Sequence, residues 1–135
     1  MKVVIIDGQG GKMGKMIIER IKSAQVPCEL TAIGTNSIAT SAMIKAGANA
    51  GATGENPVIV ATHNADVIIG PIGIIAANSL LGEITPAMAV AVGQSKAKKL
   101  LLPVNLCNNI IVGTATLPLV KLIEDAVEEL SKLIK

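Results

Sequence analysis

The sequence predicts one α/β domain in which a mostly parallel β-sheet carries helices on both faces, the doubly wound arrangement. Residues 1–24 contain a β-branched run, then glycines, then apolar side chains at helical spacing. Apolar runs and helical patterns alternate along the rest of the chain, as expected when crossover helices join parallel strands. The chain has 135 residues, the length of a single domain, and we expect residues 1–135 to form one.

The first strand is expected at residues 3–7, because Val3 to Ile6 form an uninterrupted apolar run typical of strands buried on both faces. A helix is expected at residues 12–24, where apolar side chains recur every three or four positions. These apolar positions are Met13, Met16, Ile17, Ile21 and Ala24.

The same two periodicities predict the later elements. Further strands are expected at residues 29–34, 58–61, 67–70, 100–104 and 110–113. Helices are expected at residues 38–47, at 74–81, from Thr85–Pro86 onward, and at 117–134. Residues 48–56 are rich in Gly and Asn and are expected to form a loop.

The turn between the first strand and the first helix is the clearest candidate for a binding site. Glycines recur there every third position, and free N–H groups meet the positive end of the helix dipole. We expect this turn to bind a phosphate, and the alternative is that its glycines only let the helix pack on the strand. The expected contact residues are Gly8, Gln9, Gly10, Gly11, Lys12, Met13 and Gly14.

The spacing of the glycines limits which class of nucleotide site this turn can form. The usual dinucleotide fingerprint would need Gly at Met13, and a P-loop would need Ser or Thr at Met16, so P-loop hydrolysis is disfavoured. The run Gly11–Gly14, Gly-Lys-Met-Gly, resembles the nucleotide-binding opening of dihydrodipicolinate reductases. That resemblance ends near Arg20 and brings no catalytic residue with it.

The end of the second strand, Gly34-Thr35-Asn36-Ser37, bears on the cofactor. An NAD site usually places Asp or Glu here and an NADP site an Arg nearby, and neither is present, which weakens the case for NAD. Thr35, Asn36 and Ser37 could bind a ribose or a 2′-phosphate, or Asn36 and Ser37 could cap the next helix. We expect NAD(P) or another nucleotide as the ligand.

Loops after later strands also qualify, because ligands of such sheets bind beyond the carboxyl ends of the strands. The turn containing Gly70, Pro71 and Gly73 could form a second anion cradle or a plain turn. Amide side chains after residue 104 suit a sugar or a base edge. They belong to Asn105, Asn108 and Asn109.

No set of catalytic residues stands out, so whether the protein is an enzyme stays open. Cys107 is the one candidate nucleophile, but the sole histidine, His63, lies in another loop. Asp7 could bind Mg²⁺ or a ribose hydroxyl, or fix the turn through its own backbone. Glu83 is a similar lone carboxylate whose role stays open, or it is a solvated connector between two expected helices, and we predict no metal site.

Composition limits the partners. The chain is 50% hydrophobic and only 16% charged, and between Ala46 and Ser95 its charged residues are Glu55, Asp66 and Glu83, which favours a homo-oligomer, most simply a dimer. The absence of aromatic residues and the net charge of +2 disfavour nucleic acid, and the missing aromatics also make a flavin less expected.

Location follows from the cysteines and from the apolar runs. Two cysteines without a signal peptide favour a reduced, cytoplasmic protein. The longest apolar stretch, Val67 to Leu81, contains Pro71 and Asn78, so no membrane span is expected.

The whole chain is similar to a small bacterial family of unknown function whose members share this length. The similar stretches are Asp7–Gly14, Gly34–Asn36, Gly70–Gly73 and Gly82–Pro86. This resemblance implies a Rossmann-like fold and a bacterial cytoplasmic setting, but no activity. The preferred hypothesis is a nucleotide-binding protein, which as an enzyme would be an NAD(P)-dependent oxidoreductase. The alternatives are a structural or regulatory subunit that lost its ligand, and an enzyme that uses Cys107 on a small metabolite.

Overall fold

The computed structural model describes residues 1–104, 106 and 108–134. Its strands are β1 (Lys2–Asp7), β2 (Glu29–Gly34), β3 (Ala50–Thr53), β4 (Val67–Pro71) and β5 (Lys98–Leu102). They form one sheet in the order β3-β2-β1-β4-β5, and each neighbouring pair is parallel. The prediction of a doubly wound α/β fold is confirmed.

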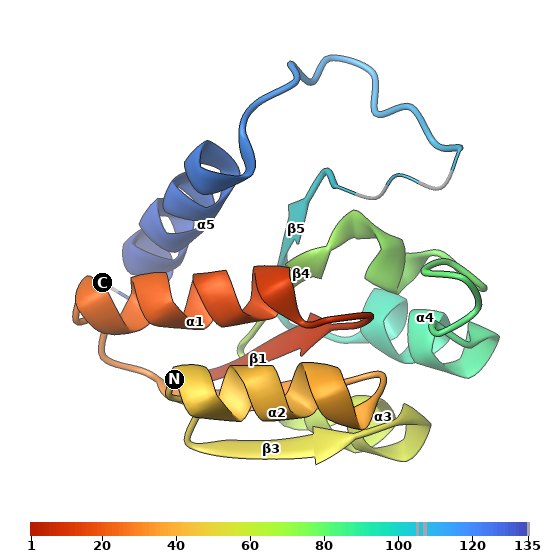
Figure 1. The fold of residues 1–135 in the computed structure, drawn as a ribbon, viewed down its shortest axis with the longest axis horizontal. Coiled ribbons are helices and arrows are strands. Elements are labelled where there is room, and N and C mark those ends of the chain that lie inside the picture. The colour runs from red at the N-terminus through yellow and green to blue at the C-terminus, as the bar shows by residue number, and fades with distance from the viewer. Residues whose placement is uncertain (105, 107, 135) are drawn as a thin grey trace.

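Helices cover both faces of this sheet (Figure 1). They are α1 (Lys12–Ser23), α2 (Ser37–Ala46), α3 (Glu55–Asn64), the short 3-10 helix η1 (Ile72–Ile75), α4 (Pro86–Gln94) and α5 (Leu119–Ile134). One hydrophobic cluster joins the sheet to α1, α2 and α5, and a second joins its other face to α3, η1 and α4.

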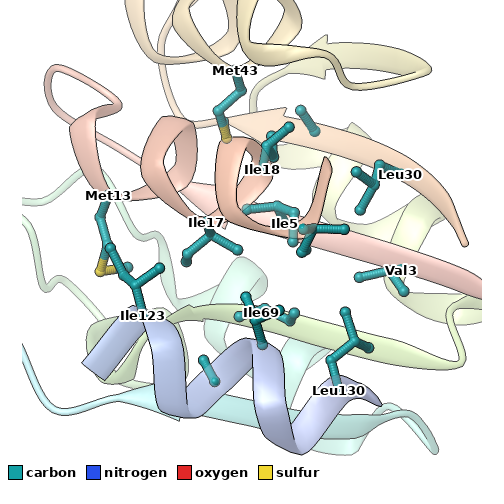
Figure 2. Packing of buried hydrophobic residues seen from close by; sticks show 14 of the residues in the cluster. Val3, Ile5, Met13, Ile17, Ile18, Leu30, Met43, Ile69, Ile123 and Leu130 are labelled. Carbon is teal, nitrogen blue, oxygen red and sulfur yellow. The ribbon is translucent and has the colours of Figure 1, made fainter. Parts of the chain in front are cut away.

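The central strand β1 supplies side chains to both clusters, because successive side chains of a strand point to opposite faces. Val3 and Ile5 belong to the cluster beneath α1 and α5, whereas Val4 and Ile6 belong to the cluster beneath α4. In Figure 2, Ile17 of α1 lies between Ile5 of β1 and Ile123 of α5 in the first cluster. The apolar run at residues 3–6 is therefore buried on both faces, as predicted.

The prediction of a strand at residues 58–61 and a loop at 48–56 is wrong. Residues 58–61 lie inside α3, where Val58 is buried and Val60 is 58% exposed, so the apolar run was helical. The strand before it is β3, whose sequence Ala-Gly-Ala-Thr carries no large apolar side chain. An edge strand bonded on one side can form from such residues, because β2 supplies its hydrogen bonds.

The predictions of a helix at 74–81 and a strand at 110–113 are also wrong. Only η1 and irregular turns occupy 72–84, because the backbone is left-handed at Asn78, Leu80, Leu81 and Gly82. Residues 110–113 form no strand and include a turn at residues 112 and 113, in a long segment that runs away from the sheet before α5 (Figure 1). Strand β5 lies two residues earlier than expected, at Lys98–Leu102.

Candidate functional site

The glycine-rich turn lies at the point in the sheet where strand order reverses. From β1 the chain builds outward through β2 and β3, then crosses to the other side of β1 to add β4 and β5. Ligands of doubly wound sheets bind in the crevice outside the carboxyl ends of the strands at this position. The turn from β1 to α1 begins at Asp7 and ends at Gly11, the N-cap residue directly before helix α1.

Asp7 holds the turn in shape from inside the protein. Its Oδ1 accepts the backbone N–H of Gly8 at 2.8 Å, and its Oδ2 accepts the N–H of Gly14 at 2.7 Å. The side chain is buried, and this burial raises the pKa of Asp7 although the N–H groups of Gly14 and Gly8 act in the opposite direction. Of the roles left open for Asp7, the geometry favours fixing the turn.

Glu83 also contacts the turn, although it comes from the segment between η1 and α4. Its Oε1 accepts the backbone N–H of Gln9 at 2.8 Å and the Nδ2–H of Asn36 at 3.2 Å, and it forms a short hydrogen bond with the Thr35 hydroxyl. Burial acts to raise the pKa of Glu83, but these donors outweigh it and lower the pKa. The carboxylate thus joins the β1–α1 turn to the β2–α2 turn.

A cavity of about 280 Å³ opens over the turn. It is lined by Asp7, Gly8, Gln9, Gly10, Gly11, Lys12 and Met13, together with Val104 and Leu119. At Gly10 an added Cβ would meet nothing within 4 Å, so the backbone there faces open space. Within the described residues, we find no hydrogen bond to the N–H groups of Gly10 and Lys12.

The other three glycines of the turn are each required by close packing. A Cβ at Gly8 would lie 2.6 Å from Thr35 Oγ1, and one at Gly14 would collide with the Met43 side chain. Gly11 has φ of 73° and its Cβ would lie 2.7 Å from Ala39 Cα. These contacts explain the three-residue spacing, while Gly10 has no such neighbour.

The structure brings Thr35 and Asn36 next to the turn and gives Asn36 two roles. Its Oδ1 accepts the N–H of Ala39 at 2.9 Å, which caps α2, and its Nδ2 donates to the Gln9 carbonyl at 2.9 Å. Ser37 is the first residue of α2. Capping and contact with the glycine turn are therefore compatible at Asn36.

The turn between β4 and η1 is more enclosed than the turn between β1 and α1. Gly70 lies within β4, where a Cβ would be 2.5 Å from the Ile6 carbonyl oxygen, and Pro71 ends that strand without an N–H to donate. Gly73 belongs to η1, and its carbonyl accepts hydrogen bonds from the Ser79 hydroxyl and the Ala76 N–H. An anion cradle at Gly70, Pro71 and Gly73 stays a prediction.

The predicted sites after residue 104 lie partly outside the residues that the structure describes. Asn105 and Cys107 lie outside the described residues, so their proposed roles stay predictions. Asn108 and Asn109 are exposed, and Asn109 donates its backbone N–H to the Leu106 carbonyl at 2.9 Å. His63 lies at the end of α3, opposite the carboxyl edge of the sheet.

Sequence reasoning missed one residue of this site, Glu83. A lone acid between two expected helices carried no signal that it would contact residues 9, 35 and 36. Across the part of the chain that the structure describes, no group of three His, Cys, Asp or Glu could hold a metal ion. Nor does any helix there have the length and apolarity to cross a membrane, and a cytoplasmic location stays a prediction.

The fold and the turn define a Rossmann-like α/β protein with a glycine-rich first loop. Within that class, the chain belongs to the family described as a domain of unknown function, DUF3842, whose profile matches residues 2–135. The predicted membership of a family of unknown function is confirmed. A search among curated proteins found no match.

One solved structure with a similar fold is a dodecameric FMN-dependent Ubix-like decarboxylase from Escherichia coli O157:H7. The two chains are 16% identical, the TM-score is 0.47, and the match covers 98% of this chain and 76% of the other. A likeness at this level supports no statement about the ligand or the assembly of this protein.

Proposed function

We propose that this protein binds a nucleotide or a dinucleotide, with NAD(P) as the first candidate. Its phosphates would lie on the turn from Gly8 to Met13, and a ribose would lie beside Thr35 and Asn36. The observation that carries the proposal is the cavity of about 280 Å³ lined by every residue from Asp7 to Met13, at the switch point of the sheet.

The backbone N–H donors around the cavity fit a phosphate. Gly10 and Lys12 offer N–H groups that no other group in the described chain occupies, at the positive end of the α1 dipole. The open space at Gly10 lets an anion come close to the backbone. The volume lies just below the usual range of ligand pockets, about 300–1,000 Å³, so it suits the phosphate end of a nucleotide and leaves its sugar nearer Thr35.

A bound NAD(P) would supply hydride transfer, which is the chemistry of the cofactor. The chain's own contribution would be to hold the phosphates and the ribose. We assign no catalytic residue, because Asp7 is buried and bonded to the turn.

A panel of nucleotides in a dye-monitored thermal-shift assay tests the proposal. It would contain NAD, NADP, their reduced forms, ATP, GTP, FMN and S-adenosylmethionine. A ligand at a hundred times its dissociation constant should add about 2.7 kcal/mol of stability, which raises the melting temperature by several degrees.

The test variant should place a negative charge at the turn without a steric clash, and its control should place the same charge elsewhere. Gly10→Asp does so, because its Cβ would meet open space, whereas at Gly11 a side chain would strike Ala39. Gly93→Asp adds the same charge in α4, also without a clash, and serves as the control. We expect Gly10→Asp to abolish the shift and Gly93→Asp to keep it; equal shifts in both variants would contradict phosphate binding at the turn.

A second candidate function is a structural or regulatory subunit that has lost its ligand. The observation that favours it is internal occupation of the turn, since Asp7 and Glu83 accept N–H groups from Gly8, Gln9 and Gly14. No thermal shift with any nucleotide, together with co-purification of a stable partner, would favour this candidate.

We also propose that the protein forms a homo-oligomer, most simply a dimer. Large apolar side chains are exposed at Leu81 (95%), Ile110 (87%) and Val112 (92%), and burying them in a subunit interface would remove them from water. Light scattering at micromolar concentration should give a multiple of the chain mass of 13.8 kDa. A monomeric mass would contradict this proposal.

A further inference from the structure

We infer that Glu83 is the acidic residue that recognises the ribose hydroxyls of the bound nucleotide, so that the protein selects an unphosphorylated ribose, as in NAD, over a 2′-phosphorylated one, as in NADP. This inference rests on the proposed nucleotide-binding function. Dinucleotide-binding proteins of this fold usually carry the ribose-binding acid at the end of the second strand. In this chain Thr35 and Asn36 follow Gly34 there, so the acid would come from a distant segment instead.

The position of the Glu83 carboxylate matches this role. In dinucleotide-binding proteins of this fold, an acid at the end of the second strand accepts hydrogen bonds from the ribose hydroxyls. Here the Glu83 carboxylate lies at that end, bonded to Thr35, to Asn36 and to the N–H of Gln9. Gln9 also lines the cavity over the glycine turn, so the acid lies beside the proposed phosphate position.

The hydrogen bonds leave part of the carboxylate available. All three donors bond to Oε1, and among the described residues no donor to Oε2 is found. A carboxylate has two acceptor oxygens, so Oε2 can accept a ribose hydroxyl while Oε1 remains bonded to the protein. The same negative charge would repel a 2′-phosphate placed there.

The backbone before Glu83 is strained in a way that aims the side chain. Leu80 and Leu81 have φ of 55° and 56°, a left-handed conformation that bulky residues rarely adopt, and Gly82 continues it. The segment is closed by the Asn78 N–H bonded to the Ile84 carbonyl at 2.7 Å. Leu80 is anchored by burial. Strain held in place by such contacts is typical of functional positions.

Gly8 supports the same assignment from the opposite side. A Cβ at Gly8 would lie 2.7 Å from Glu83 Oε1 and 2.6 Å from Thr35 Oγ1. The absence of a side chain at this position is what allows the acid to reach the turn. Contact with Glu83 therefore helps to explain why residue 8, the first glycine of the turn, has no side chain.

The test is isothermal titration calorimetry of NAD and NADP with the full chain, with Glu83→Gln and with Glu55→Gln. Glu83→Gln keeps an acceptor oxygen beside these donors and removes the charge. Glu55→Gln makes the same change of charge at a carboxylate that bonds Thr85 instead. Far-UV circular dichroism checks that each variant is folded, and Glu83→Ala serves as a second variant.

We expect the wild type and Glu55→Gln to bind NAD at least about tenfold more tightly than NADP, since a hydrogen bond to a charged group has about that value. Glu83→Gln and Glu83→Ala should reduce this preference by a similar factor. An unchanged preference in both variants, or no preference in the wild type, would overturn the inference. So would tighter binding of both dinucleotides, because the carboxylate would then block the site. If the wild type binds neither, the proposed dinucleotide function itself fails.

Discussion

Gly11→Ala is expected to destabilise the protein by at least about 2 kcal/mol. Gly11 has φ of 73°, and a non-glycine residue held in that region costs about 1–3 kcal/mol. The new Cβ would also lie 2.7 Å from Ala39 Cα and 2.9 Å from the Ala39 carbonyl oxygen. Those are backbone atoms of α2 that cannot rotate away, and overpacking of this kind costs about 1–3 kcal/mol more.

Gly10→Ala is the matched control for this prediction. Its Cβ would meet nothing within 4 Å and its φ is not left-handed, so a change within about 0.5 kcal/mol is expected. Both free energies of unfolding can be measured in urea by far-UV circular dichroism, because the chain has no aromatic residue to report by fluorescence. If Gly11→Ala were as stable as Gly10→Ala, the packing explanation for the glycine spacing would be refuted.

Three further predictions concern stability. Burial raises the pKa of Asp7, so the wild type loses stability as the pH rises above about 4, and Asp7→Asn should flatten this dependence of the free energy of unfolding on pH. Equal slopes of that free energy against pH in the two proteins, measured by urea titration, would contradict this. Thr85→Ala should cost about 1 kcal/mol, because the Thr85 hydroxyl caps α4 by accepting the N–H of Met88 at 3.2 Å, while Thr85→Ser should keep most of it in thermal melts. Ile17→Ala should cost about 2–5 kcal/mol because Ile17 is fully buried, whereas Ile38→Ala, at a 70% exposed position, should change the free energy of unfolding by less than about 0.5 kcal/mol; similar losses would contradict the assigned core.

Local pattern was enough to predict the elements around the glycine turn. The run from Val3 to Ile6 has no polar residue, and α1 has one apolar and one charged face, so β1 and α1 lie where their sequence predicts. Thr85–Pro86 also marked the start of α4 correctly, because a capping threonine and a first-turn proline act on their own helix. These signals involve residues close in the chain.

Strand β3 shows why other elements could not be predicted in this way. The sequence Ala50–Thr53 has weak strand preference, and its pairing with Thr31 to Gly34 of β2 supplies the hydrogen bonds that make it a strand. The run Val58–Val60 has strong strand preference, yet it lies in a helix because only Val58 packs into the core. Tertiary contacts override propensity at both places.

Local sequence patterns were enough to predict the fold class, the first strand and helix, and the turn that we propose binds phosphate, because each depends on neighbours within a few residues. The contact of Glu83 with Gln9, Thr35 and Asn36, by contrast, depends on how the chain folds in three dimensions. That contact depends on the parallel sheet bringing the ends of β1 and β2 together and on the left-handed backbone at Leu80 and Leu81. The first condition arises from pairing between segments far apart in the chain, and the second was not predictable from the sequence because leucine rarely adopts a left-handed backbone.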